Sequence, residues 1–87
     1  MGPDIKIIWL PHALDMCAKR GILKEWALKA LFEPVRVEPD PNHKDRIRVW
    51  RRIPEFGGRM LRLVYEEEQE AVVIITVVWD RNAGRRV

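Results

Sequence analysis

Residues 46–53 read RIRVWRRI, and this alternation of apolar and charged side chains predicts a β-strand with one covered and one open face. The side predicted to face the core carries Ile47, Val49 and Ile53, with Arg51 intruding among them. The side predicted to face outward carries Arg46, Arg48, Trp50 and Arg52. Positive charge interleaved with an aromatic ring is typical of surfaces that follow a phosphate backbone and stack a base.

Further strands are predicted on both sides of this stretch. Turn residues or a Pro-rich connection separate most of them, and the predicted strands cover residues 5–9, 35–38, 59–66 and 72–79. The last of these is apolar at nearly every position, which predicts a central strand covered on both faces. The acidic residues at 66–70 predict a solvent-facing turn before it.

Two helices are predicted near the N-terminus. The first covers residues 11–20, with Pro11 in its first turn and Gly21 as its left-handed cap. The second covers residues 23–33 and ends before Pro34. Together these elements predict an α+β domain in which a helical hairpin packs on a mostly antiparallel meander sheet.

The length of the chain predicts a single domain. Its 87 residues leave room for one modest core, which we place at about residues 5–80, followed by a basic tail at 81–87. Hydrophobic residues make up 47 % and charged residues 33 %, which excludes intrinsic disorder. No apolar run is long enough for a membrane span, no secretory signal is visible, and the single cysteine excludes an internal disulfide framework. We therefore expect a cytoplasmic protein.

The distribution of charge suggests an anionic partner. The whole chain has a net charge of +3, but residues 35–65 carry eight basic and four acidic groups. Arginine outnumbers lysine eleven to five, and arginine is the side chain best suited to bidentate phosphate contact. Ordinary surface arginines on exposed strands explain the same pattern equally well.

Several kinds of chemistry are excluded or disfavoured by the residues present. The chain contains no serine, so a serine-based triad is impossible. His12, Cys17 and His43 do not have the spacing of a metal site, and Gly57-Gly58 is not followed by the helix of a phosphate-binding loop. We expect no metal and no cofactor.

His12 and Thr76 remain as candidates for chemistry. His12 falls near the start of the first predicted helix, where the positive end of the helix dipole favours a neutral imidazole that can act as a general base. A histidine that only bonds the backbone at a helix start is the alternative. Thr76 is the lone polar residue in an apolar strand, where it either bonds within the sheet or faces a site.

A resemblance extends over about residues 5–80. The motifs that carry it are His12-Ala13, Arg20-Gly21-Ile22, Arg46-x-Arg48-Val49, Gly58-Arg59-x-Leu61-Arg62 and Ile75-Thr76-Val77. With these motifs the chain resembles a family of small bacterial domains of unknown function, which is grouped with the RelE/ParE-type toxins of the barnase, EndoU, colicin and RelE class of ribonucleases. The chain departs from the pattern at Leu10-Pro11, at Met16, where a basic residue is common, and at Leu23, where Ser or Thr is common.

This resemblance implies a toxin-like, metal-independent endoribonuclease. In that role His12 would be the base or acid, Arg48 and Arg62 would clamp phosphate, and Thr76 would orient the substrate. The implied substrate-binding residues are Arg20, Arg46, Trp50, Arg52 and Arg59. The implied partners are RNA, including ribosome-associated mRNA, a cognate antitoxin and a second copy of the chain.

Two other functions remain open. One is a non-catalytic module that binds nucleic acid or protein through a toxin-like fold. The other is an interaction domain that uses Trp9, Trp26 or Trp79 at an oligomer interface.

Overall fold

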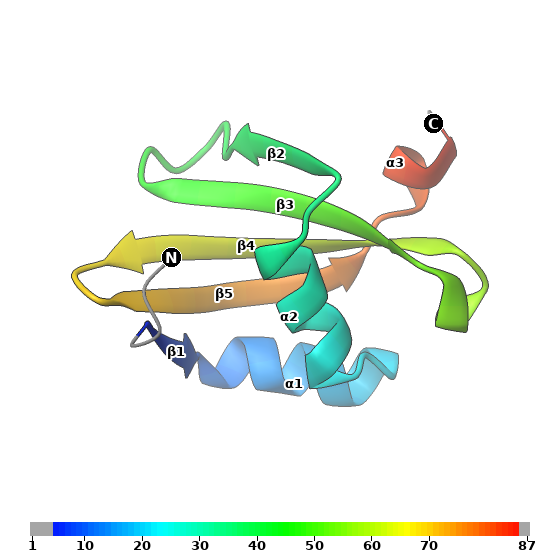
Figure 1. Ribbon diagram of the computed structural model, residues 1–87, viewed down its shortest axis with the longest axis horizontal. Helices are drawn as coiled ribbons and strands as arrows, with labels where there is room; N and C mark the ends of the chain where they lie inside the picture. The colour runs from blue at the N-terminus through cyan, green and yellow to red at the C-terminus, as the bar shows by residue number, and fades with distance from the viewer. Residues whose placement is uncertain (1–4, 86–87) are drawn as a thin grey trace.

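The computed structural model describes residues 5–85 and shows an α+β fold, as the sequence predicts (Figure 1). Residues 1–4 and 86–87 lie outside the described residues. The first residues of the segment judged to lack a secretory signal and the end of the predicted basic tail are therefore not described. A five-stranded sheet has the order β1-β5-β4-β3-β2. Its strands are β1 (Lys6–Trp9), β2 (Arg36–Pro39), β3 (Arg46–Ile53), β4 (Arg59–Glu68) and β5 (Ala71–Trp79).

The sheet is mostly antiparallel, but β1 pairs in parallel with β5. The expectation that the last strand is central is wrong, because β4 holds that place and β5 lies between β4 and β1. Helices cover β5 on one face, where Ile74 and Val77 are fully buried, whereas Thr76 and Val78 on the other face are only half-buried. A bulge between Val64 and Tyr65 shifts the register of β4 against β5.

The first two helices begin and end close to their predicted positions. Helix α1 (Pro11–Arg20) ends at Gly21, whose φ of 66° is the left-handed conformation that glycine adopts without strain. Helix α2 is Lys24–Phe32. The predicted helical hairpin does not form a packed pair: α1 packs mainly along β5, whereas α2 lies across β3 and β4. Figure 1 shows the two helices crossing at a steep angle.

The hydrophobic core lies between the sheet and the helices. It includes Ala13 and Cys17 of α1, Trp26 of α2, and the inward residues Val49 and Leu63 of the sheet. Burial raises the pKa of the Cys17 thiol, as expected for a small core residue. None of the helices in residues 5–85 is long and apolar enough to cross a bilayer.

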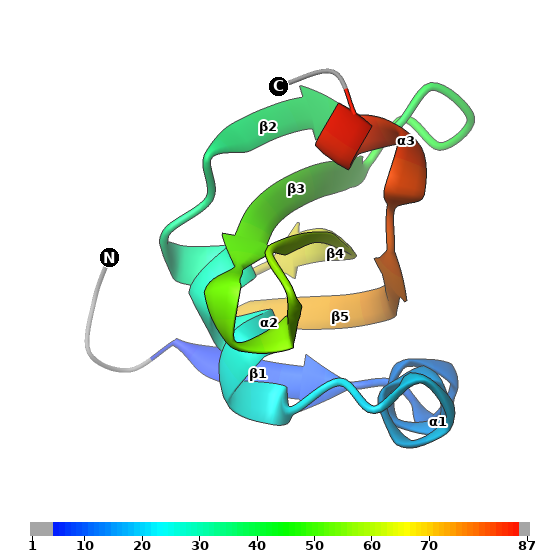
Figure 2. The ribbon, with the colours of Figure 1, turned by 90° about the vertical axis from the view of Figure 1, so that its right-hand side faces the viewer.

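A second, smaller cluster lies on the opposite face of the sheet. It consists of Trp50, Met60 and Ala83. Ala83 comes from helix α3 (Arg81–Arg85), where the sequence predicts a basic tail and no helix. Figure 2 shows α2 and α3 on opposite sides of the sheet. We call the sheet face that carries Trp50 and Met60 the open face, because among the elements of residues 5–85 only the short helix α3 covers part of it.

Candidate nucleic-acid interface

The open face collects arginines from three neighbouring strands. Because directly paired residues of antiparallel strands point to the same face, the pairing of Trp50 with Arg62 and of Arg48 with Val64 places both arginines beside Trp50. The same register adds Arg36 of β2, opposite Trp50. The arginines of this face are Arg36, Arg46, Arg48, Arg52 and Arg62. The predicted outward side of residues 46–53 is therefore confirmed for its arginines.

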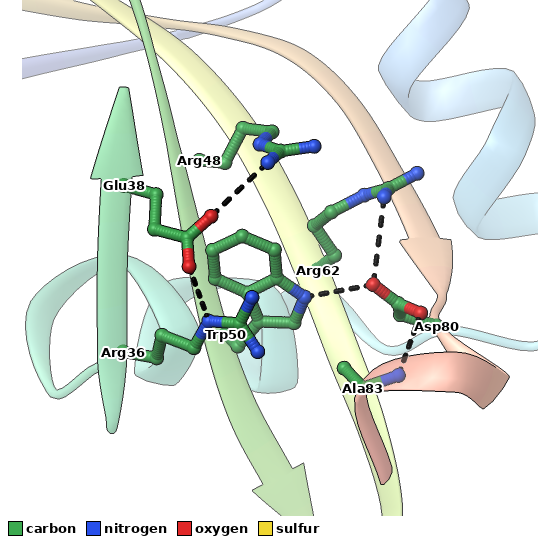
Figure 3. A network of polar contacts seen from close by, with 7 residues as sticks. All are labelled: Arg36, Glu38, Arg48, Trp50, Arg62, Asp80 and Ala83. Carbon is green, nitrogen blue, oxygen red and sulfur yellow. Dashed lines mark hydrogen bonds and ion pairs between the residues drawn. The ribbon is translucent and has the colours of Figure 1, made fainter. Parts of the chain in front are cut away.

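The prediction that Trp50 faces outward to stack on a base is wrong. Its side chain is only 1 % exposed, so it cannot stack on a base without rearrangement. The guanidinium carbons of Arg36 and Arg48 lie 4.3 Å and 5.1 Å from its ring centroid, as cation–π partners that cover the indole. Glu38 holds both of these arginines, accepting from Arg36 Nε at 2.7 Å and from Arg48 Nη2 at 3.1 Å (Figure 3). The hydrogen bond from Arg36, followed by that from Arg48, lowers the pKa of Glu38.

Asp80 joins the strands of the open face to α3. Its Oδ2 accepts from Trp50 Nε1 at 2.8 Å and from Arg62 Nη1 at 3.4 Å, and its Oδ1 accepts from the backbone N–H of Ala83 at 3.0 Å (Figure 3). Burial raises the pKa of Asp80, but these hydrogen bonds and the charge of Arg62 outweigh it, so the net pKa lies below its usual value. The aspartate is therefore a structural anion and a poor proton acceptor.

The lowered pKa of Asp80 predicts a specific loss of stability in acid. Above about pH 4, the ordinary pKa of Asp, the carboxylate is charged in both folded and unfolded chains and its contribution is complete. As the pH falls further, toward the lower native pKa, the unfolded chain takes up the proton first and the contribution is lost. We expect the difference in free energy of unfolding between wild type and Asp80→Asn to be largest near pH 6 and to shrink below about pH 4.

Denaturant unfolding at several pH values measures this difference. The control is Asp15→Asn, which removes an exposed ion pair with Lys19 on α1 and should change stability by no more than about 0.5 kcal/mol. A difference for Asp80→Asn that stays constant from pH 6 to pH 2 would contradict the proposed role of the carboxylate.

The arginines of the open face have hydrogen-bond donors that no protein acceptor among the described residues engages. Each guanidinium has five N–H donors, and Glu38, Glu66 and Asp80 engage only some of them. The Nε atoms of Arg46, Arg48 and Arg62 are buried and have no hydrogen-bond acceptor among the described residues. Arg52 donates from Nη1 to the carbonyl oxygen of Gly58 at 2.7 Å. The buried Nε atoms are out of reach of a ligand, so a bound anion would be contacted by the terminal N–H groups that these carboxylates leave free, without breaking every existing ion pair.

A groove at one end of the sheet gathers four arginines. It has a volume of about 570 Å³ and begins on the open face at Arg62 and Val78. We call it the arginine groove, and its lining residues are Arg20, Phe56, Arg59, Arg62, Val78, Trp79, Asp80, Arg81 and Asn82. The four arginines come from α1, α3 and two positions of β4. The fold therefore brings together, in one groove, positive charges that are far apart in the sequence.

Helix α1 runs beside β5, which locates His12. The backbone N–H of Leu10 donates to the Ile74 carbonyl oxygen at 3.2 Å, and Trp79 Nε1 donates to the Arg20 carbonyl oxygen at 3.1 Å. Ten helical residues and five strand residues both advance about 15 Å, so the two elements stay in step between these contacts. His12 therefore lies near the level of Ile75, about 12 Å along the helix from Arg20.

Three of the four predicted catalytic residues, Arg48, Arg62 and Thr76, fall into two neighbouring rows of the sheet. Thr76 pairs with Val64, which pairs with Arg48, so Thr76 and Arg48 lie two strands apart, at about 10 Å. Arg62 lies in the next row, between Trp50 and Val78. His12 is exposed and does not line the arginine groove, so it stands at the β5 side of these rows and outside the cluster of guanidinium groups.

Sequence reasoning missed Asp80, Arg81, Arg36 and Phe56, and it suggested Trp79 only for an oligomer interface. Asp80 directly follows an apolar strand, and a polar side chain at such a position can indicate a functional or structural site. Its partner Trp50 is 30 residues away in the sequence, so the contact itself could not be predicted. Within residues 5–85, no three His, Cys, Asp or Glu side chains come together in a way that could hold a metal ion.

Comparison with known proteins gives a family and no closer relative. No curated protein and no solved structure matches the chain. One family model, described as a domain of unknown function, DUF4258, matches residues 9–79. This match begins at the last residue of β1 and ends with β5, so it includes strands β2 to β5 and helices α1 and α2 in full. The chain therefore belongs to the DUF4258 family.

Proposed function

We propose that this protein is a toxin-type endoribonuclease that holds single-stranded RNA along the open face and in the arginine groove. The observation that carries the proposal is the convergence of Arg20, Arg59, Arg62 and Arg81 on one groove that continues onto the arginine-rich open face. Guanidinium groups match phosphate geometry, and a line of them is the electrostatic pattern expected for a nucleic-acid backbone.

The proposed reaction uses the ribose of the RNA as its nucleophile. A base removes the proton of the 2′-hydroxyl, the oxygen attacks the adjacent phosphorus, and the bond to the 5′-oxygen breaks as an acid protonates it. His12 is the proposed base, because an imidazole can accept a proton at neutral pH. Arg48 and Arg62 would stabilise the charge that accumulates on the phosphoryl oxygens, and Thr76 would orient the RNA between them.

A non-catalytic RNA-binding module is the second candidate, and one observation favours it. Glu38, Glu66 and Asp80 already neutralise part of the charge on the sheet, and His12 lies outside the guanidinium cluster. Such a surface would bind a polyanion without necessarily bringing a base to the scissile phosphate. Both candidates use the same arginines, and they differ in whether the RNA is cleaved.

Salt dependence tests the binding surface that both candidates share. The logarithm of the association constant for single-stranded RNA should fall linearly with the logarithm of salt concentration, with a slope of about −0.7 per phosphate contact. Arg48→Ala should reduce the magnitude of this slope by about one contact, because its guanidinium lies on the open face. Fluorescence anisotropy with a labelled oligonucleotide, titrated at several salt concentrations, measures the slope.

Arg51 supplies the matched control. It lies on the same strand but on the opposite face, where its Nη1 donates to the carbonyl oxygen of Glu33 at 2.6 Å. Arg51→Ala should leave the salt slope unchanged. Equal effects of the two substitutions, or no RNA binding at low salt, would reject the open face as the binding surface.

A further inference from the structure

The arginine groove ends at an aromatic pair that the proposed reaction does not use. Phe56 and Trp79 are stacked with ring centroids 4.5 Å apart and an angle of 7° between their planes. The guanidinium carbon of Arg59 lies over Phe56 at 5.2 Å. All three residues line the arginine groove, so they form a preassembled column of flat groups beside the proposed phosphate contacts.

We propose that Phe56, Trp79 and Arg59 form a stacking platform for one base of the bound RNA. The proposal rests on the proposed function, since it assigns the base-binding part of the same RNA site. It replaces Trp50, which the sequence suggested for this role and which is buried. Bases stack well on aromatic rings and on guanidinium planes, and such contacts tolerate different base identities.

The platform is held in place before any ligand binds. Trp79 Nε1 donates to the carbonyl oxygen of Arg20 at 3.1 Å, which ties its indole to the end of α1. Trp26 packs against both rings at tilted angles, with centroid distances of 5.7 Å to Phe56 and 6.0 Å to Trp79. A fixed aromatic surface loses little conformational entropy on binding, which favours its use as a contact for a ligand.

Both members of the aromatic pair pack on the edge of the core and stay half-buried, so each keeps some surface that a ligand can contact. Trp79 also lines a second cavity of about 290 Å³, which it shares with Arg52, Arg59 and Arg81. A groove of about 570 Å³ is in the size range of small-ligand sites. The side-chain amide of Asn82, also in the lining, can both donate to and accept from the edge of a base.

A comparison of two probes tests the platform. Wild-type protein is titrated with a 2′-O-methylated uridine octamer, which cannot be cleaved through its 2′-oxygen, and with an abasic octamer of the same backbone and charge. We expect the base-bearing octamer to bind about fivefold more tightly or better, with the same salt slope. Equal affinities for the two probes would overturn the platform while leaving the arginine surface intact. Failure to bind either probe at low salt would overturn the proposed function, and the platform with it.

Substitutions locate the contact within the groove. Trp79→Leu should abolish the preference for the base-bearing octamer, whereas Trp79→Phe, which keeps a flat ring, should retain most of it. The control Trp9→Leu removes a half-buried tryptophan of β1 that does not line the groove, and it should leave the preference unchanged. If Trp79→Leu folds and still shows the wild-type preference, the platform is wrong. If it does not fold, the two-probe comparison on wild-type protein decides.

Discussion

Replacing His12 by alanine should slow RNA cleavage by about 10²–10⁴-fold while leaving the fold and the RNA affinity unchanged. The imidazole is the proposed base, and His12 lies near the level of Ile75, one residue before Thr76, beside the rows that hold Arg48 and Arg62. Its side chain is exposed, so its removal leaves no cavity in the core. Single-turnover cleavage at saturating protein isolates the chemical step from RNA binding.

His43 provides the matched control for this substitution. It is the only other histidine of the chain and lies in the exposed connection between β2 and β3, with its Nδ1 3.9 Å from Asp40. His43→Ala should cleave RNA at the wild-type rate. A full rate for His12→Ala, on protein shown to be folded, would remove the histidine from the mechanism and favour the binding module.

Replacing Trp50 by alanine should lower the free energy of unfolding by about 3–5 kcal/mol, as for other buried large aromatic residues. The side chain is 1 % exposed, packs with Met60 and Ala83, and donates to Asp80 at 2.8 Å. Its loss would leave a cavity beneath Arg36 and Arg48 and would remove a donor from Asp80. Denaturant unfolding followed by circular dichroism measures the change.

Trp50→Phe separates the packing of the ring from its hydrogen bond. This variant keeps a flat apolar group but cannot donate to Asp80, so its loss of stability should be smaller than that of Trp50→Ala. A loss of less than about 1 kcal/mol for Trp50→Ala would show that the indole is exposed in solution, since surface substitutions generally have small effects. The sequence-based expectation of Trp50 as a base-stacking residue would then be restored.

Local signals in the sequence predict most of the secondary structure. Pro11 and Gly21 mark the limits of α1, and the alternation over residues 46–53 identifies both the strand β3 and the faces of its side chains. The relative placement of elements depends on contacts between distant residues, which such signals do not contain. The steep crossing of α1 and α2 and the position of β5 beside the parallel strand β1 are of this kind.

The candidate site was predictable to the extent that a single strand defines it. Alternation alone places Arg46, Arg48 and Arg52 on one face, and the β3–β4 register places Arg62, which the resemblance had suggested, beside them. The burial of Trp50 could not be predicted, because the residues that cover it come from β2, β4 and α3. Helix α3 is only five residues long and contains a glycine, so the sequence gives it little helical signal.

The chemical ends of cleaved RNA test the central claim most directly. Purified protein is incubated with RNA in the presence of a chelator, with and without ribosomes, and the products are analysed by mass spectrometry. Attack by the ribose 2′-oxygen predicts fragments with a 2′,3′-cyclic phosphate at one end and a 5′-hydroxyl at the other, and the loss of these fragments with 2′-O-methylated RNA. RNA that stays intact under every condition, or fragments that carry 5′-phosphates, would contradict the proposed ribonuclease.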